Sequence, residues 1–400
     1  MNKKFLTVNT LTSFNNTSFN HDESGQSKTC MVGGVIRGRI SSQCLKYHWR
    51  RSDTMSNLDL NSGIKHTRTR KAFSDLLFEK IKSEGVFDEK TILTYTNELL
   101  ASFKNPKRDP SKDEDSKEES DKKEKKSTAK EQKASKKELE SQQVLCFAQT
   151  ELDFLEETLR DALSSNDINK VKKGLDLKKL KYPLTPSVAL SGKFSTEANL
   201  PTVESSLNVA HSFSVHQHSS DHDFFIASDD LGEDTGAAHL GATDITSNTF
   251  YGFLVIDLNK YSLNRFSTSF DNLEVENKEK LLNEISVFVE TVCKTAPSGK
   301  SSATAPQQKA HFLLLELTNN PTGLSNAFRK AIPNNESLIP TAYDRIISFL
   351  SDMDNDYGVE SIRGYFGQDI SESQKLSFEN NLSSKRISIP TLKEWLQNNL

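Results

Sequence analysis

The chain has 400 residues, 34% of them hydrophobic, and its 51 lysines and arginines against 55 acids give a net charge of -4. This balance excludes a protein that is basic overall, although a local cationic surface remains possible. No run of eighteen apolar residues occurs and the N-terminal stretch is too polar for a signal peptide, so neither a transmembrane helix nor a membrane partner is expected. The four cysteines form no CxxC pair, and we predict a cytoplasmic protein without a disulfide framework, a metal site or a cofactor.

The predicted elements alternate between strands and helices. Phe5–Leu11 is expected to be the first strand and Val35–Ile40 the second. A serine at position 41 or 42 then caps a helix that ends near Arg51. Later helices are predicted at 72–81, 91–103, 144–163, 281–293, 327–332, 341–350 and 391–398, and later strands at 250–256 and 311–317. This order shows neither regular βαβ spacing nor repeats, and it predicts an α+β fold.

Residues 104–140 form a highly charged segment. It holds thirteen Lys or Arg and eleven Asp or Glu residues, and it has no aromatic side chain. Such a composition buries too little apolar surface to repay the entropy of ordering, which predicts a disordered or loosely helical insertion. The lysines could also contact a polyanion, but the interleaved acids favour a solvated tether.

A basic window lies between Ser24 and Ser52, where no acidic residue occurs. Arg37 and Arg39 fall on one face of the predicted strand, because side chains repeat every two residues. Lys46 and Arg50 are four residues apart and share a helix face. The helix begins beside the arginines, and its free N–H groups add to an anion site suited to successive phosphates. The alternative is an ordinary cationic surface.

Residues 31–50, MVGGVIRGRISSQCLKYHWR, closely resemble the N-terminal signature of the backbone subunit of type I-E CRISPR Cascade, the CasC-like family. The family has a Gly-Gly pair, alternating basic residues and an Arg-Ile-Ser-Ser-Gln-Ser-Leu-Lys run that ends in arginine. Further similar segments follow in the same order at residues 19–22, 188–196 (VALSGKFST), 208–241, 324–328 and 389–399. The resemblance therefore covers nearly the whole chain outside the charged segment.

The resemblance implies a right-hand shape. Residues 1–54 and 181–400 would form an RRM-like, ferredoxin-type palm, residues 55–180 a helical fingers region, and residues 197–235 approximately a β-hairpin thumb. Family members are non-catalytic subunits that polymerise head to tail along CRISPR RNA (crRNA) and present kinked base segments for pairing with target DNA in antiviral defence. The implied partners are crRNA, target DNA, further copies of the chain, and the large, small, handle-capping and crRNA-processing subunits of Cascade.

The resemblance also implies the RNA-binding residues. Those expected to contact the crRNA backbone are His21, Lys28, Arg37, Arg39, Ser41, Gln43, Lys46 and Arg50. Lys193 is expected to reach a phosphate, and Phe194 replaces a methionine that wedges between bases in the family. His21 replaces an arginine, so its contact is expected to weaken near neutral pH. The alternative for Phe194 is an ordinary buried core position.

The sequence also contains features typical of chemistries other than RNA binding. Five histidines between His211 and His239, with Asp221 and Asp223 among them, suggest a metal site, but no HExxH motif or cysteine completes a ligand set. The sequence after Pro297 ends like a phosphate-binding loop but lacks its first glycine. The alternative function is a metal-dependent endoribonuclease of a type III-like CRISPR effector. The loop from Ser24 to Ser41 holds no carboxylate for that chemistry, which disfavours it.

Overall fold

The computed structural model describes residues 4–103, 137–171, 175, 177–180, 182–195, 199–228 and 237–400, with the side chains at 227–228 and 237–239 left aside. The chain divides into two compact units. The first comprises residues 1–61 and 206–400, and the second comprises residues 62–205. The boundaries expected from the sequence, after residues 54 and 180, lie before these divisions of the chain.

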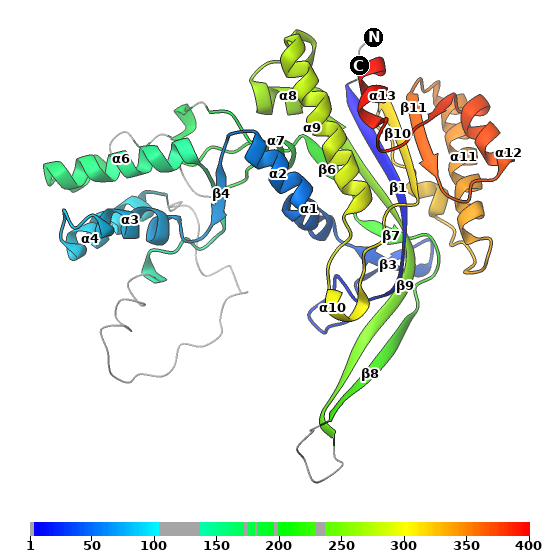
Figure 1. Ribbon diagram of the computed structural model, residues 1–400, viewed down its shortest axis with the longest axis horizontal. Coiled ribbons are helices and arrows are strands. Elements are labelled where there is room, and N and C mark those ends of the chain that lie inside the picture. The colour runs from blue at the N-terminus through cyan, green and yellow to red at the C-terminus, as the bar shows by residue number, and fades with distance from the viewer. Residues whose placement is uncertain are drawn as a thin grey trace. The chain divides into compact units, whose positions relative to one another are not determined.

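Ten strands of the described chain form one sheet in the first unit (Figure 1). They are β1 (Phe5–Thr17), β2 (Thr29–Val32), β3 (Val35–Ile40), β6 (Leu207–Val209), β7 (Ser212–Ser214), β8 (Ser220–Ser228), β9 (Ala237–Asp257), β10 (Phe312–Thr318), β11 (Ile362–Gly367) and β12 (Ser384–Arg386). Eight lie in the order β12-β11-β10-β1-β9-β7-β3-β2, while β6 and β8 pair separately with β9. Only the β11–β12 pair is parallel among these described pairs.

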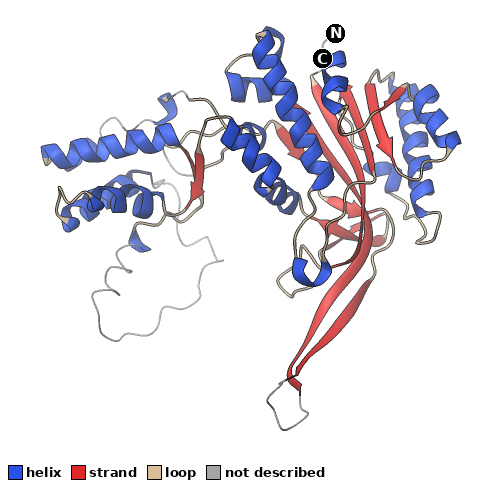
Figure 2. Ribbon diagram, in the orientation of Figure 1, coloured by secondary structure: helices blue, strands red, loops and turns tan. Residues whose placement is uncertain are grey.

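Helices cover both faces of this sheet (Figure 2). The helices of the first unit are α1 (Ser42–Arg51), α2 (Asp53–Asn61), α8 (Leu258–Phe266), α9 (Val275–Lys294), α10 (Ser301–Thr304), α11 (Leu338–Tyr357), α12 (Glu372–Leu376) and α13 (Leu392–Asn399), with the short helical segments η6 (Phe270–Asn272), η7 (Ser325–Phe328) and η8 (Ser377–Asn381). On one face α1 packs on α9, where the rings of Trp49 and Phe288 are 5.9 Å apart. On the other face, the ring of Tyr343 of α11 lies tilted beside that of Phe312 of β10, with the ring centroids 5.1 Å apart. All seven residues of β10 are buried between these layers.

The hairpin β8–β9 extends from the sheet because β9 is 21 residues long and only its C-terminal part pairs with β1. Its two strands pair from Ser220 opposite Thr246 outward. Phe224, Ile226 and Leu240 are 68%, 66% and 62% exposed. The hairpin thus begins near residue 220, within the range of 197–235 expected for the thumb. Residues 207–214 belong to the main sheet, and residues 229–236 lie outside the described residues.

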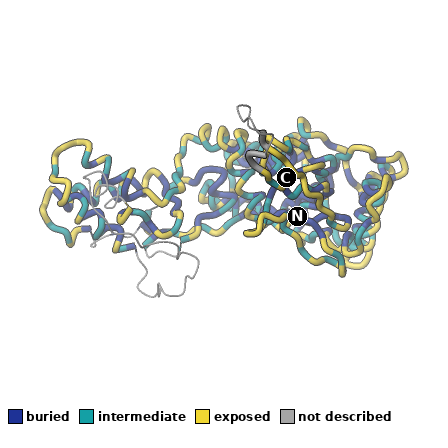
Figure 3. Tube along the Cα trace, turned by 90° about the horizontal axis from the view of Figure 1, so that it is seen from below, coloured by how far each residue is buried: buried dark blue, intermediate teal, exposed yellow. Residues whose placement is uncertain are grey.

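The second unit is mainly helical. It contains η1 (Ala72–Phe78), α3 (Glu79–Ser83), α4 (Glu89–Phe103), α6 (Gln149–Ser165), η4 (Ile168–Val171), η5 (Leu177–Lys179), α7 (Pro186–Ser191) and a two-stranded sheet of β4 (His66–Thr69) and β5 (Leu145–Ala148). Buried residues recur along these elements (Figure 3). The helix expected at 144–163 begins only at Gln149, because the apolar run Leu145–Ala148 pairs with β4. No described helix in either unit has the length and apolar character needed to cross a membrane.

The charged segment is only partly described. Its residues 104–136 lie outside the described residues, so the expectation of disorder there is not tested. Its last residues are ordered, which corrects the expected end of the insertion at residue 140. Leu139 is fully buried in the core of the second unit, and Ser141 donates its backbone N–H to the carbonyl of Arg70 at 2.9 Å. Burial of Leu139 and this hydrogen bond join the end of the charged segment to the second unit.

Candidate nucleic-acid interface

Helix α1 carries part of the expected basic surface. Ser41 caps it, because its backbone is extended and its Oγ accepts the Cys44 N–H at 3.3 Å. Leu45 and Trp49 are buried on the inner side. The outward positions follow at helical spacing: Gln43 is exposed, and Lys46 and Arg50 are half-buried. The sequence prediction of the helix and of its basic side is confirmed.

The loop of residues 18–28 folds back onto the start of α1. Asn20 organises it: its Oδ1 accepts the Ser41 N–H at 2.7 Å, and its carbonyl accepts the Lys28 N–H at 3.1 Å. The Lys28 carbonyl in turn accepts the Arg39 N–H at 2.8 Å. Asn20 has φ of 59°, a left-handed conformation that asparagine tolerates better than most residues. Lys28, Arg39 and Ser41 are therefore brought together, as the sequence predicted for one anion site.

His21 lies in the same loop with one ring nitrogen committed. The Ser18 hydroxyl donates its hydrogen to the carbonyl of Asp244 at 2.7 Å. Because that hydrogen is used, His21 Nε2, 2.9 Å from Ser18 Oγ, must be protonated and donate to Ser18 Oγ. The neighbouring Asp22 is held by its own turn, where its Oδ1 accepts from Ser24 and Gln26. These hydrogen bonds, that of the Ser24 hydroxyl first, lower the pKa of Asp22.

Arg37 does not belong to the surface, which corrects the prediction that it faces a phosphate beside Arg39. Its side chain is fully buried. One guanidinium nitrogen donates to the carbonyl of Ser214 at 2.8 Å, and the other to Phe328 at 3.2 Å and Arg329 at 3.5 Å. Burial lowers its pKa. Arg37 therefore ties β3 to β7 and to the η7 turn.

The start of α1 is also less open to an anion than expected. The Ser42 N–H donates to Nδ1 of His211 at 3.1 Å, and the Cys44 N–H is occupied by Ser41. Further along, the Ser298 N–H donates to Nε2 of His48 at 3.0 Å, which leaves Nδ1–H to donate to the Cys44 carbonyl at 2.8 Å. The lysine-serine loop after Pro297 thus packs against α1 instead of forming a phosphate cradle.

Three cations of this region have no carboxylate partner among the described residues. No ion pair between described residues involves Lys28, Arg39 or Lys46. Burial lowers the pKa of Lys46. A half-buried ammonium without a partner gains more from an incoming phosphate than a fully hydrated one, because part of its desolvation has already occurred. We call Lys28, Arg39, Lys46, Gln43 and His21 the basic surface.

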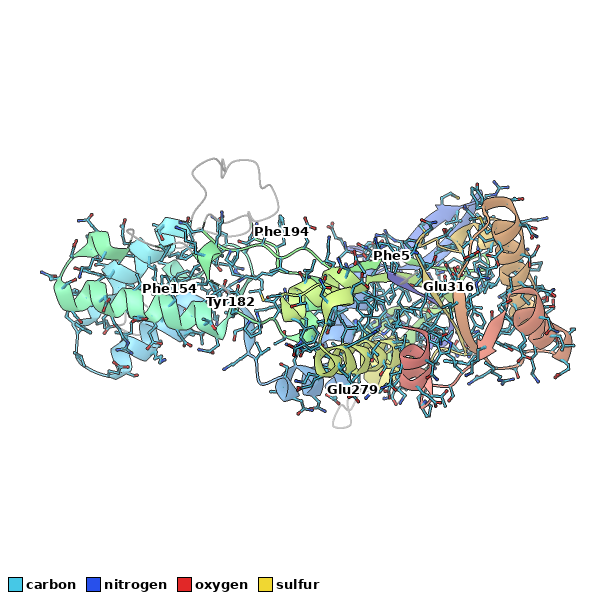
Figure 4. The ribbon with its side chains drawn as sticks, turned by 90° about the horizontal axis from the view of Figure 1, so that it is seen from above. Phe5, Phe154, Tyr182, Phe194, Glu279 and Glu316 are labelled. Atoms are coloured by element: carbon cyan, nitrogen blue, oxygen red, sulfur yellow. The ribbon has the colours of Figure 1, made fainter. Side chains whose placement is uncertain are left out.

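Lys193 and Phe194 lie in the second unit and point to opposite sides of the chain. Lys193 is 1% exposed, and its Nζ lies 2.6 Å and 2.5 Å from the two carboxylate oxygens of Glu151. This ion pair corrects the prediction that Lys193 reaches a phosphate. Phe194 is 79% exposed (Figure 4), which excludes the alternative of a core position.

The histidines His216 and His218 each hydrogen-bond to their own neighbours and not to a shared site. His216 accepts the Thr249 N–H at Nε2, 3.1 Å away, and its Nδ1 donates to the Gln217 carbonyl. His218 Nδ1 accepts from the Asn248 amide at 3.3 Å. Within the described ranges no three His, Cys, Asp or Glu side chains gather as metal ligands. The metal-site alternative gains no support there.

Residues 6–395 match the CT1975-like protein family. The chain belongs to this Cas family. Its fold is similar to that of a chain described as "CRISPR RNA-guided surveillance complex, pre-nicking", with a TM-score of 0.72, 20% identity, and coverage of 99% of this chain and 100% of that one. A second similar chain, described as "CRISPR RNA-guided surveillance complex", gives 0.64 and 16%, with coverage of 99% and 100%. No curated protein matches the sequence.

Two features of this CT1975-like protein escape a reading of its sequence. Asp244 of β9 reaches the basic surface, where its Oδ2 accepts the Ser27 N–H at 2.9 Å. Burial would raise the pKa of Asp244, but hydrogen bonds from Ser27 and Ser220 lower it. The second feature is Glu151, the buried partner of Lys193. Nothing in the neighbouring sequence indicates either role, because Asp244 accepts from Ser27, far earlier in the chain, and Glu151 pairs with Lys193, 42 positions later.

Proposed function

We propose that this CT1975-like protein is a non-catalytic backbone subunit of a type I-E CRISPR Cascade complex that polymerises head to tail along crRNA. The observation that carries the proposal is the basic surface, where Lys28 of the loop, Arg39 of β3 and Lys46 of α1 come together. In the part of the chain that the structure describes, none of the three forms an ion pair with a carboxylate. Phosphates of a single strand satisfy such cations without reading sequence. The similarity in fold to chains of CRISPR RNA-guided surveillance complexes supports the same role.

The sheet supports an RRM-like palm within the first unit. With the additional strands β2, β3, β6 and β8 and the short helices set aside, β1 is followed along the chain by α1 and α2, then by β7, β9, α9 and β10. In space the order is β10-β1-β9-β7, with antiparallel neighbours. This is the βαββαβ arrangement of ferredoxin-like folds. In the proposal the second unit is the fingers region, and the β8–β9 hairpin is the thumb, whose exposed apolar side chains suit contacts with bases.

The proposed partners follow from this role. They are crRNA, target DNA through pairing with crRNA, further copies of this chain, and the large, small, handle-capping and crRNA-processing subunits, all in the cytoplasm during antiviral defence. The first test is co-expression with a CRISPR array and purification. We expect RNA of one defined length to co-purify with the protein. Protein free of RNA, or carrying RNA of random lengths, would contradict the proposal.

Lys46→Ala is expected to weaken RNA binding equally for all sequences. Losing one phosphate contact to a single strand reduces the slope of log K against log salt by about 0.7. Titrations of two unrelated RNAs at several salt concentrations measure both effects. The matched control is Lys375→Ala, because Lys375 is also half-buried but pairs with Glu372 at 2.9 Å on α12. A change in sequence preference, or an unchanged slope, would remove Lys46 from the interface.

Phe194→Ala is expected to leave stability nearly unchanged but to weaken RNA binding by ~1–3 kcal/mol per subunit, the range for stacking of one base on an aromatic ring. The exposed ring has little packing to lose on its own chain. A melting curve without RNA, paired with an RNA titration, measures both quantities. Phe194→Trp serves as the control that retains stacking. Equal affinity for Phe194→Ala and the unsubstituted protein would refute the wedge.

The absence of catalysis is part of the proposal. Among the carboxylates beside the basic surface, Asp22 accepts backbone N–H groups of its own loop, and Asp244 of β9 accepts the N–H of Ser27 from that loop. Incubation of the assembled complex with complementary RNA distinguishes this function from an endoribonuclease. We expect the RNA to remain intact with divalent metal present, and specific cleavage would favour the nuclease.

A further inference from the structure

We propose that the Lys193–Glu151 pair is a positioning device that selects which of two neighbouring side chains enters the interior, and so holds Phe194 outside. The inference rests on the proposed function of Phe194 as a base wedge. The observation behind it is that Lys193 and Phe194 reverse the usual preference of lysine for solvent and of phenylalanine for the interior. A lysine is 1% exposed while the phenylalanine beside it is 79% exposed, although phenylalanine is among the residues most often buried and lysine among the least.

Glu151 is the centre of the interior site. Its carboxylate accepts from Lys193 Nζ with both oxygens, from the Tyr182 hydroxyl at 2.6 Å, and from the Ala148 N–H at 2.7 Å. Burial, together with the charge of Glu151, raises the pKa of Tyr182, so the phenol remains a donor. Glu151 is itself fully buried at the start of α6.

The backbone around Lys193 is fixed as tightly as its side chain. Lys193 and Val203 exchange both backbone hydrogen bonds, at 2.9 Å and 2.7 Å. Gly192 has φ of +73°, and a Cβ there would lie 2.6 Å from the Val203 carbonyl oxygen. Arg68 donates to the Gly192 carbonyl at 3.3 Å. In an extended segment, consecutive side chains point to opposite sides, so burial of Lys193 sends Phe194 outward.

The charge makes this choice of side specific. If the segment shifted by one residue, Phe194 would enter the interior and Lys193 would reach solvent. With an apolar site that exchange would be favourable. With Glu151 in the site, the exchange leaves a buried carboxylate without its cation, which is strongly unfavourable. Replacing both partners by apolar residues, in contrast, is often neutral. The ion pair therefore adds little net stability and instead excludes the alternative arrangement.

The test replaces both charges, in Glu151→Leu/Lys193→Leu, and follows position 194 directly. Phe194→Trp in each background reports exposure by acrylamide quenching in the absence of RNA; the natural Trp49 and Trp395 are 5% and 2% exposed and give a constant background. We expect the introduced indole to be readily quenched in the parent and protected in the double variant. Lys193→Arg, which keeps the charge, should retain the parent quenching.

RNA binding supplies the second readout. The double variant is expected to bind RNA about 5- to 150-fold more weakly, the equivalent of one lost base stack, and adding Phe194→Ala should then cost nothing further. A folded double variant with unchanged quenching would overturn the inference, as would an affinity loss that persists in full on the Phe194→Ala background. If the parent protein binds no RNA, the proposed function fails, while the quenching result still decides whether the ion pair positions residue 194.

Discussion

Arg363→Met is expected to lower the free energy of unfolding by ~3–5 kcal/mol, the range for breaking a buried ion pair on one side. Arg363 is 3% exposed on β11. Its Nε donates to Glu316 at 2.8 Å, and its two terminal nitrogens bind Asp354 at 2.5 Å and 2.6 Å. Methionine fills a similar volume, so the loss reports the two carboxylates left without their cation.

The pH dependence of this variant gives a sharper check. Burial raises the pKa of Glu316, and Arg363 opposes that shift. Without the guanidinium the pKa rises further, so protonation relieves the unpaired charge at mildly acidic pH. Urea unfolding at pH 8 and pH 5 should therefore show the larger loss at pH 8. Lys385→Met, an exposed change on the neighbouring β12, is the control. An Arg363→Met loss equal to that of the control would contradict the assignment.

Arg37→Ala is expected to lower stability by about 2–4 kcal/mol without any RNA present, because it opens a cavity and leaves buried carbonyls without donors. Those carbonyls belong to Ser214, Phe328 and Arg329. Arg39→Ala is the matched control from the same strand. Arg39 is half-buried and makes no ion pair among the described residues, so its loss should affect RNA affinity more than melting temperature.

The comparison of the two variants separates a structural arginine from a binding one. Melting temperatures of the proteins without RNA are measured first. RNA titrations follow at a temperature below the lower of the two melting temperatures. The assignment requires a large decrease in melting temperature for Arg37→Ala and a small one for Arg39→Ala. If instead Arg37→Ala melts like the parent protein and only its RNA affinity falls, Arg37 belongs with the phosphate-binding residues.

Local sequence patterns were sufficient for several elements. Val35–Ile40 is a strand and α1 follows the serine cap as predicted, because alternation, capping and helical spacing are properties of neighbouring residues. The α+β class also holds. The helix expected at 144–163 was partly wrong: Leu145–Ala148 reads as the first turn of an apolar helix but pairs with a strand almost eighty residues earlier. Pairing at that distance leaves no local signal.

The sequence by itself predicted the basic window, a serine cap at position 41 or 42 at the start of α1, and the shared helix face of Lys46 and Arg50. It also determined that residues 31–50 resemble a crRNA-binding signature. Only the tertiary structure decided which cations face solvent. Arg37 and Arg39 have the same local pattern, yet the carbonyls of β7 and η7 bury one of them. Lys193 and Phe194 exchange their usual environments because Glu151, 42 positions before Lys193, places a buried negative charge beside the chain. Burial depends on what packs from elsewhere in the chain, and residue type alone does not contain that information.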